Sequence, residues 1–329
     1  MRVGTFGYCT SRGLGHLVRD FHRHGIITDP FLIMHHRVPN NPDWYSENTP
    51  RTSLNDMDTA AMEQFALNMD AMLFFETPFH WDIIPFCEKH GIRTYLVTMY
   101  ECTPIEHPRP HKYICPSLLD MEYFQRDSVQ LNLPVEVEWR PRGVVQHYVH
   151  NGGYLGLRGR EGTTLLIDAL PYIKSPIQLT IRVQENVSEG CQLKMAADPR
   201  VTYIAGTVPY HELYSTGEAV VAPQKFNGCS LPLQEAFASG MLMITTDRFP
   251  MNSWLPEKPL IPVSGYLSSR VSGRCLSFQE AIVDPVEIAH RIDEWYGKDA
   301  SEFSYLGQLW AEANSWEVLK PKYLEVLSN

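Results

Sequence analysis

Short apolar segments of strand length alternate with helix-length segments along most of this 329-residue chain. The first such unit is a strand at residues 3–8, a glycine-rich loop at 9–15 and a helix from His16 to about His24. Strands that are joined by helices pair in parallel, and the helices cover the faces of the resulting sheet. The alternation therefore predicts an α/β chain built from doubly wound, Rossmann-like sheets.

A segment at residues 135–150, rich in Pro, Arg and Gly, separates two series of these units. With 329 residues, of which 44% are apolar, the chain is long enough for two hydrophobic cores. We therefore expect a first domain at residues 1–140, a second at 141–305, and a closing helical segment at 306–329 that can pack back on the first domain. In the second domain, strands are predicted at 153–157, 177–183, 201–204, 219–222 and 241–246, and closing helices at 285–295 and 302–327.

The composition excludes several classes of protein. A net charge of −10 argues against a broad basic surface that would bind nucleic acid or anionic lipid without specificity. The seven cysteines are scattered and include no Cys-x-x-Cys pair, so neither a disulfide framework nor a zinc knuckle is expected. The sequence shows no signal peptide and no apolar run of membrane-spanning length. We expect a cytoplasmic protein without a metal site or an obligate protein partner.

Residues 226–240 place small side chains directly before a predicted helix. The turn at Gly228 and Ser230 can direct free backbone N–H groups, together with the positive end of that helix, at an anion. One turn further along, Glu235 can accept hydrogen bonds from a diol. This pattern indicates a phosphate-binding loop followed by a carboxylate that can hold a sugar or a ribose.

A second glycine-rich loop, with Gly13 and Gly15, follows the first predicted strand. A dinucleotide fingerprint would require a third glycine where Val18 stands and an acidic residue at the end of the next strand, which instead ends in His35-His36-Arg37. An NAD site is therefore not expected. Two interpretations remain open: the glycines allow a substrate to approach, with His16 as a hydrogen-bond donor, or the loop is only a tight turn that a histidine caps.

Four charged residues stand at predicted strand ends, where α/β sheets bind ligands. Arg158 and Arg160 follow the first strand of the second domain, and the planar donor fork of arginine suits a diphosphate. Glu76 and Glu101 each end an apolar strand of the first domain, where they could bind acceptor hydroxyls or act as a base. The alternative is structural: solvated turns for the arginines, helix caps or salt bridges for the glutamates.

Taken together, these motifs resemble the GT-B glycosyltransferases, and in particular the retaining family-four enzymes that use nucleotide-sugar donors. The resemblance covers most of residues 140–250 and is weaker, though colinear, over the first domain. In that family a strand that ends in an aromatic or aliphatic residue followed by x-Gly-x-Val precedes the nucleobase pocket, and the segment from Tyr203 through Gly206 is similar. The family hallmark is a pair of glutamates that flank a Gly-rich turn, and the second of them, Glu235 here, is implied to hold the ribose hydroxyls.

The chain departs from the family pattern at two positions. Asn227 stands where the family has its first glutamate, near the transferred sugar, so it can bond sugar hydroxyls but adds no negative charge. Glu161 stands where the family has a lysine that neutralises the diphosphate, which leaves that task to Arg160. The motifs and the resemblance together predict a catalytic set of His16, Glu76, Glu101 and Asn227, and a donor-binding set of Gly13, Gly15, Arg158, Arg160, Tyr203, Gly206, Gly228, Cys229, Ser230, Leu231 and Glu235.

The fold and activity that the resemblance implies are two Rossmann-like domains facing a central cleft and transfer of a hexose, from a nucleotide-diphosphate sugar such as UDP-glucose, to a hydroxyl. Retaining members transfer on one face of the sugar, with the leaving diphosphate accepting the proton, so neither metal nor cofactor is expected. The acceptor is open between a glycan, a lipid, a small-molecule alcohol and a hydroxymethylated DNA base, as in phage enzymes that modify DNA. The rival functions are a nucleotide-sugar epimerase and a nucleotide-sugar-binding protein without catalysis.

Overall fold

The computed structural model describes the chain except for residues 105, 154–158, 257–258 and 271–276. It divides into two compact units, each with its own sheet and core. The first comprises Met1–Pro134 together with Trp316–Asn329, and the second comprises the described residues from Val135 to Ser315. The change of unit at Pro134 lies six residues before the boundary expected from the sequence, since the Pro- and Arg-rich segment that follows is attached to the second unit.

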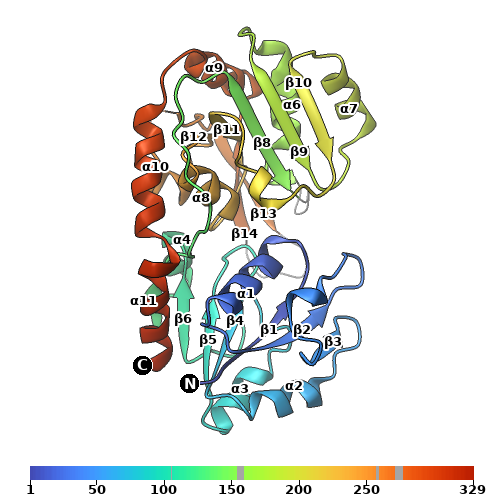
Figure 1. Ribbon diagram of the computed structural model, residues 1–329, viewed down its shortest axis with the longest axis vertical. Helices are drawn as coiled ribbons and strands as arrows, with labels where there is room; N and C mark the ends of the chain where they lie inside the picture. The colour runs from blue at the N-terminus through green and yellow to red at the C-terminus, as the bar shows by residue number, and fades with distance from the viewer. Residues whose placement is uncertain (105, 154–158, 257–258, 271–276) are drawn as a thin grey trace. The chain divides into compact units, whose positions relative to one another are not determined.

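The first unit is built on a parallel sheet of seven strands in the order β3-β2-β1-β4-β5-β6-β7 (Figure 1). The order runs outward from β1 in both directions, as in doubly wound folds, and it reverses between β1 and β4. The strands are β1 (Val3–Tyr8), β2 (Asp29–Met34), β3 (Arg51–Ser53), β4 (Ala71–Phe75), β5 (Arg93–Val97), β6 (Lys112–Cys115) and β7 (Ser128–Gln130). The helices are α1 (Gly13–Arg23), α2 (Thr59–Ala66), α3 (Ile83–Lys89), α4 (Leu118–Tyr123) and α11 (Trp316–Ser328), with a 3-10 turn η1 (Pro42–Trp44).

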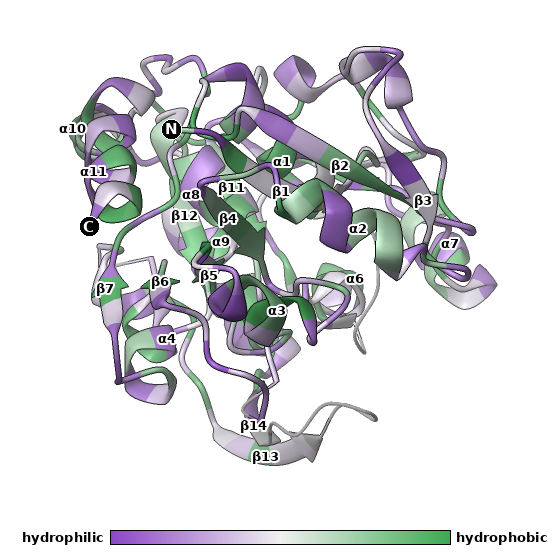
Figure 2. Ribbon diagram, turned by 90° about the horizontal axis from the view of Figure 1, so that it is seen from below, coloured by the Kyte–Doolittle hydropathy of each residue, from purple (hydrophilic) through white to green (hydrophobic). Residues whose placement is uncertain are grey.

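Hydropathy follows position in this sheet. Every residue of β4, in the middle, is buried, and its sequence AMLFF is wholly apolar. The edge strand β3, with sequence RTS, is exposed at both ends. Figure 2 shows the contrast as a green β4 and a purple β3. From the sequence, residues 40–53 are expected to form a polar loop. The last three of them form β3, whose polar sequence gives no strand signal.

The last helix, α11, packs on the first unit through aromatic contacts. The Phe21 ring lies 5.1 Å from Trp316 and 4.9 Å from Tyr323, both in edge-to-face geometry. The Tyr95 hydroxyl donates to the Leu327 carbonyl at 3.1 Å. The closing segment read from the sequence as one helix at 302–327 is in fact two, because Asn314 ends the first and donates from Nδ2 to the Trp310 carbonyl at 2.8 Å.

The second unit repeats the architecture with five parallel strands in the order β10-β9-β8-β11-β12, so its order reverses between β8 and β11. A separate antiparallel hairpin, β13-β14, was not predicted from the sequence. The strands are β8 (His147–Gly153), β9 (Gln178–Val183), β10 (Val201–Ala205), β11 (Ala219–Ala222), β12 (Leu242–Thr245), β13 (Gly265–Arg270) and β14 (Ser277–Ile282). The helices are α6 (Thr163–Ala169), α7 (Glu189–Ala196), α8 (Leu231–Ala238), α9 (Pro285–Trp295) and α10 (Ser301–Ala313), with 3-10 turns η2 (Leu170–Tyr172), η3 (Tyr210–Glu212) and η4 (Met251–Ser253).

The start of this unit corrects the sequence interpretation. Strand β8 begins at His147, inside the expected linker. Of the strand predicted at 153–157, Gly153 belongs to β8, and residues 154–157 lie outside the described residues. The β8 segment was not recognised as a strand because its sequence contains two polar residues, His147 and His150. His150 is nevertheless fully enclosed, with one ring nitrogen 2.7 Å from the Val221 carbonyl and the other 2.8 Å from the Thr163 hydroxyl. A histidine with both nitrogens bonded is compatible with a buried strand.

Within the described part of the chain, no helix combines the length and the apolar character needed to cross a membrane.

Candidate donor-binding site

The point where the strand order of the second unit reverses brings two loops together. Strands β8 and β11 are neighbours, and the loops that follow their carboxyl ends contain residues 159–162 and 223–230. The two loops bond directly, since the Lys225 amide donates to the Arg160 carbonyl at 2.8 Å. Open α/β sheets bind their ligands at such a reversal, outside the carboxyl ends of the strands. The two loops therefore mark the candidate site of this unit.

Gly162 is required by the fit between these loops. Its φ of +78° is one that residues with a side chain rarely adopt, and a Cβ atom there would lie 2.0 Å from the carbonyl oxygen of Pro223. Gly162 is also the residue that precedes α6, so the same close approach sets where that helix starts.

The loop at 223–230, which we call the donor loop, is fixed by its own side chains. The Asn227 carbonyl oxygen Oδ1 accepts from the Ser230 backbone amide at 2.8 Å, and Gln224 Nε2 donates to the Ser230 hydroxyl at 2.9 Å. Ser230 itself has φ of +49° and precedes α8, whose second residue is Pro232. Both Asn227 and Ser230 are buried. A left-handed residue before a helix start is a strained geometry, and such geometry clusters at ligand sites.

The donor-binding residues predicted at this loop lie together in the structure. Gly228, Cys229 and Ser230 form the end of the loop, and Leu231 is the first residue of α8. The Cys229 carbonyl accepts from Gln234 Nε2 at 2.9 Å, which ties the loop to the helix that follows. Arg158 lies outside the described residues.

Two cations accompany the loops, one of which the sequence analysis missed. Arg160 pairs with Glu161, Nε to Oε1, at 3.3 Å, and burial raises the pKa of the Glu161 carboxyl while the nearby Arg160 and Lys225 oppose that rise. Lys225 is thus close to Glu161, the position at which the glycosyltransferases that the sequence resembles have a lysine. Lys225 could have been proposed from the sequence, because it directly precedes the 226–240 stretch. Its backbone contact with Arg160 could not, because that contact depends on the order of the strands in the sheet.

Glu235, on α8, is held by two tyrosines. The Tyr210 hydroxyl donates to Oε1 at 2.7 Å, and the Tyr214 hydroxyl donates to Oε2 at 2.6 Å. Of the other predicted donor residues, Tyr203 lies on β10 and Gly206 follows that strand with φ of +118°. The Tyr203 hydroxyl lies 3.4 Å from the Asn186 side chain and from the Val187 amide, so it is tied to the neighbouring loop.

In the first unit, the predicted glycine-rich loop lies at the corresponding reversal, between β1 and β4. Helix α1 begins at Gly13, three residues before the start predicted at His16. A Cβ atom on Gly15 would lie 2.0 Å from the Thr10 carbonyl oxygen, so this glycine is needed for the turn itself. The His16 ring lies 5.1 Å from the Trp44 ring, and burial lowers the pKa of His16 to about 4. The imidazole is therefore neutral at pH 7 and offers one donor and one acceptor.

The two predicted glutamates of the first unit differ in their surroundings. Glu76 follows β4, is half-buried and has φ of +61°, and its carbonyl accepts from the Thr103 hydroxyl at 2.9 Å. Glu101 is only 1% exposed, close to the fully buried Asp120. Enclosure of Glu101 does not suit direct contact with an acceptor.

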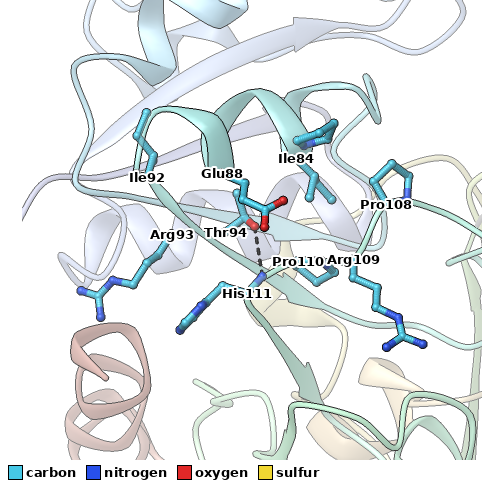
Figure 3. Close-up of a pocket in the computed structure, with 11 residues that line it drawn as sticks. Ile84, Glu88, Ile92, Arg93, Thr94, Pro108, Arg109, Pro110 and His111 are labelled. Carbon is cyan, nitrogen blue, oxygen red and sulfur yellow. Dashed lines mark hydrogen bonds between the residues drawn. The ribbon is translucent and has the colours of Figure 1, made fainter.

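One described cavity, of about 550 Å³, lies in the first unit. It opens at the amino-terminal ends of β5 and β6 and is lined by Ile84, Glu88, Arg93 and Arg109 among others. Figure 3 shows Arg93 and Arg109 pointing in different directions rather than converging on one point. The donor loop, with its strained backbone and converging polar groups, is therefore the better candidate site. No group of three or more His, Cys, Asp or Glu side chains among the described residues could hold a metal ion.

Comparisons with known proteins reveal the fold but no close relative. No protein family matches the sequence, and no curated protein does. Sucrose-phosphate synthase from Thermosynechococcus elongatus is similar in structure, with a TM-score of 0.71 and 14% identity over 100% of this chain and 98% of that one. HepE from Anabaena, in complex with UDP and glucose, has a TM-score of 0.69 and 11% identity over 100% and 99% of the two chains. The lipopolysaccharide outer core galactosyltransferase WaaB has a TM-score of 0.62 and 12% identity over 100% and 99%. The chain therefore has the GT-B fold, which confirms the predicted fold class.

Proposed function

We propose that the protein is a glycosyltransferase that moves a hexose from a nucleotide-diphosphate sugar to a hydroxyl acceptor. The observation that carries the proposal is the donor loop, which meets residues 159–162 at the sheet reversal and runs into α8 with Glu235 one turn inside. A buried turn before a helix N-terminus suits a diphosphate, and a carboxylate one turn on suits a ribose. UDP is the favoured nucleotide because the similar HepE structures contain UDP, UDP-glucose, or UDP and glucose.

We infer further that transfer retains the anomeric configuration and needs no metal. In that scheme the sugar–phosphate bond breaks, the leaving diphosphate takes the acceptor proton, and the acceptor oxygen bonds to the sugar on the same face. The protein must then stabilise the charge that develops on the diphosphate. The N-terminus of α8 and the Arg160 and Lys225 cations are the groups assigned to this task. Asn227, whose oxygen already holds the Ser230 amide, is assigned to shaping the loop.

The acceptor is assigned to the first unit, and one cluster there favours a nucleobase. The Tyr8 ring lies 5.4 Å from His35 and 4.8 Å from Phe79, and His35 stacks on His36 at 5.1 Å. Burial lowers the pKa of His35, and the charges of the nearby Arg12 and Arg37 add to that lowering, so arginines lie near these rings. Aromatic rings among cations bind unpaired bases and their phosphates. A hydroxymethylated base flipped out of DNA is therefore our leading acceptor, ahead of a glycan, a lipid or a small alcohol.

The test is to incubate the protein with labelled nucleotide sugars and to measure release of the nucleoside diphosphate with and without candidate acceptors, including hydroxymethylated DNA. We expect release that depends on an acceptor, persists in EDTA and gives a product of unchanged anomeric configuration. Conversion of the sugar without an acceptor would identify an epimerase instead. Nucleotide binding without turnover would identify a binding protein, and no binding at all would refute the donor site.

A further inference from the structure

We propose that Tyr210 and Tyr214 are positioning residues that lock Glu235 for the two ribose hydroxyls of the donor and so make the site discriminate ribonucleotides from deoxyribonucleotides. The inference rests on the proposed nucleotide-sugar site and goes beyond it, because neither tyrosine belongs to the predicted donor set. Its basis is that each oxygen of one carboxylate accepts from a different phenol, at 2.7 Å and 2.6 Å.

The segment that carries the tyrosines is itself fixed by two arginines. Arg142 donates to the Tyr214 carbonyl at 2.6 Å and to the Gly217 carbonyl at 2.8 Å. Arg182, which is 9% exposed, donates to the Leu213 carbonyl at 3.0 Å. Guanidinium groups bound to consecutive carbonyls hold this backbone in one arrangement. The Tyr210 and Tyr214 hydroxyls therefore approach Glu235 on α8 from a backbone segment that is already held in place.

Bonding from the tyrosines leaves Glu235 able to bind a ligand. A carboxylate oxygen accepts more than one hydrogen bond, so a phenol on each oxygen still permits a ribose hydroxyl on each. A phenol on each oxygen also restrains rotation of the carboxylate, which keeps the two oxygens in one orientation toward a diol. Burial, and to a lesser degree the Glu235 charge, raises the pKa of the Tyr214 phenol well above its ordinary value, so that it remains a donor.

The two tyrosines differ in exposure, which separates their effects. Tyr214 is 6% exposed and also approaches the Pro232 carbonyl at 3.4 Å, so its hydroxyl contributes to folding as well. Tyr210 is half-buried on the 3-10 turn η3, and loss of its hydroxyl should leave the fold intact. Tyr210→Phe is therefore the decisive variant, and Tyr214→Phe is the stronger but less specific one.

The experiment measures dissociation constants by calorimetry for UDP, ADP and GDP and for their 2′-deoxy counterparts. We expect the wild type to bind the matching ribonucleotide at least about tenfold more tightly than its deoxy form, the loss expected for an unpaired hydrogen bond to a charged group. Tyr210→Phe should lower this ratio about fivefold while its melting temperature stays within about 2 °C of wild type. Tyr172→Phe, an exposed tyrosine of the same unit, is the matched control and should leave the ratio unchanged.

The outcomes separate the inference from the function on which it rests. If the wild type prefers the ribonucleotide and neither Tyr210→Phe nor Tyr214→Phe changes the ratio of the two dissociation constants, the positioning role is overturned and the donor site is retained. A wild type that binds a nucleotide without discriminating ribose also overturns it. No binding of any of the six nucleotides by a folded wild type overturns both.

Discussion

Replacing Asp120 by Asn should remove a pH dependence from the stability of the first unit. Asp120 is fully buried near the N-terminus of α4, and its Oδ2 accepts from the Ser117 hydroxyl at 2.5 Å. Burial is the main cause that raises its pKa to about 7, with the Ser117 bond opposing the rise and the nearby Glu101 carboxylate adding to it. The native carboxyl is therefore half protonated near neutral pH.

The size and sign of the effect follow from linkage. An unfolded Asp has a pKa of about 3.9, so between about pH 4 and pH 7 the native state holds a proton that the unfolded state releases. The free energy of unfolding therefore falls as pH rises through this window, by about 1.4 kcal/mol per pH unit and by about 4 kcal/mol in total. Above pH 7 this contribution stays constant, since both states are then ionised.

Urea unfolding, followed by circular dichroism at half-unit steps from pH 4 to pH 8, measures the effect. The difference in unfolding free energy between wild type and Asp120→Asn should decline across the window by up to about 4 kcal/mol. Asp43→Asn, at an exposed carboxylate of the same unit, should give a difference that does not change with pH. Parallel pH curves for wild type and Asp120→Asn would refute the assignment of a protonated, buried Asp120.

Three further changes test the donor site. Glu235→Ala should raise the dissociation constant for UDP about a hundredfold by calorimetry, since two hydrogen bonds to a charged group are lost; Glu287→Ala, on α9, is the control. An unaltered affinity would show that the ribose lies elsewhere. Gly162→Ala should lower the free energy of unfolding by about 2 kcal/mol or more, because φ is +78° and Pro223 blocks a Cβ; Gly190→Ala, with nothing within 4 Å, should not. Equal stability of the two variants would contradict this. Lys225→Met should weaken UDP about tenfold but leave uridine binding unchanged, against Lys174→Met as control. If the affinities for UDP and uridine fall equally, Lys225 does not bind the diphosphate.

Much of the fold could be predicted because its signals are local. Apolar runs such as Ala71–Phe75 identify strands whose neighbours are also apolar, and the glycine-rich loop at residues 9–15 indicates that a helix follows β1, though not the residue at which the helix begins. The errors occurred where a local signal misleads. β8 carries two histidines that tertiary bonds satisfy, and the long closing segment is interrupted at Asn314 by a bond of its own side chain.

The candidate site was only partly predictable. Residues contiguous in the sequence, such as those from Gly228 to Glu235, could be assigned because the loop and its helix form one local unit. The pairs that complete the site could not be assigned, since Lys225 meets Arg160 between two loops, and Tyr210 on η3 meets Glu235 on α8. Such pairings depend on strand order, which local pattern does not encode.

The sequence by itself determined the alternation of strands and helices, the positions of the glycine turns and the presence of Glu235, because backbone preference and apolar periodicity act over a few residues. Only the tertiary structure decided that β8 and β11 are neighbours, that Lys225 lies beside Arg160, and that two phenols hold Glu235. The physical reason is that burial and hydrogen bonding between distant segments are properties of the packed sheet, where strand order selects which side chains meet.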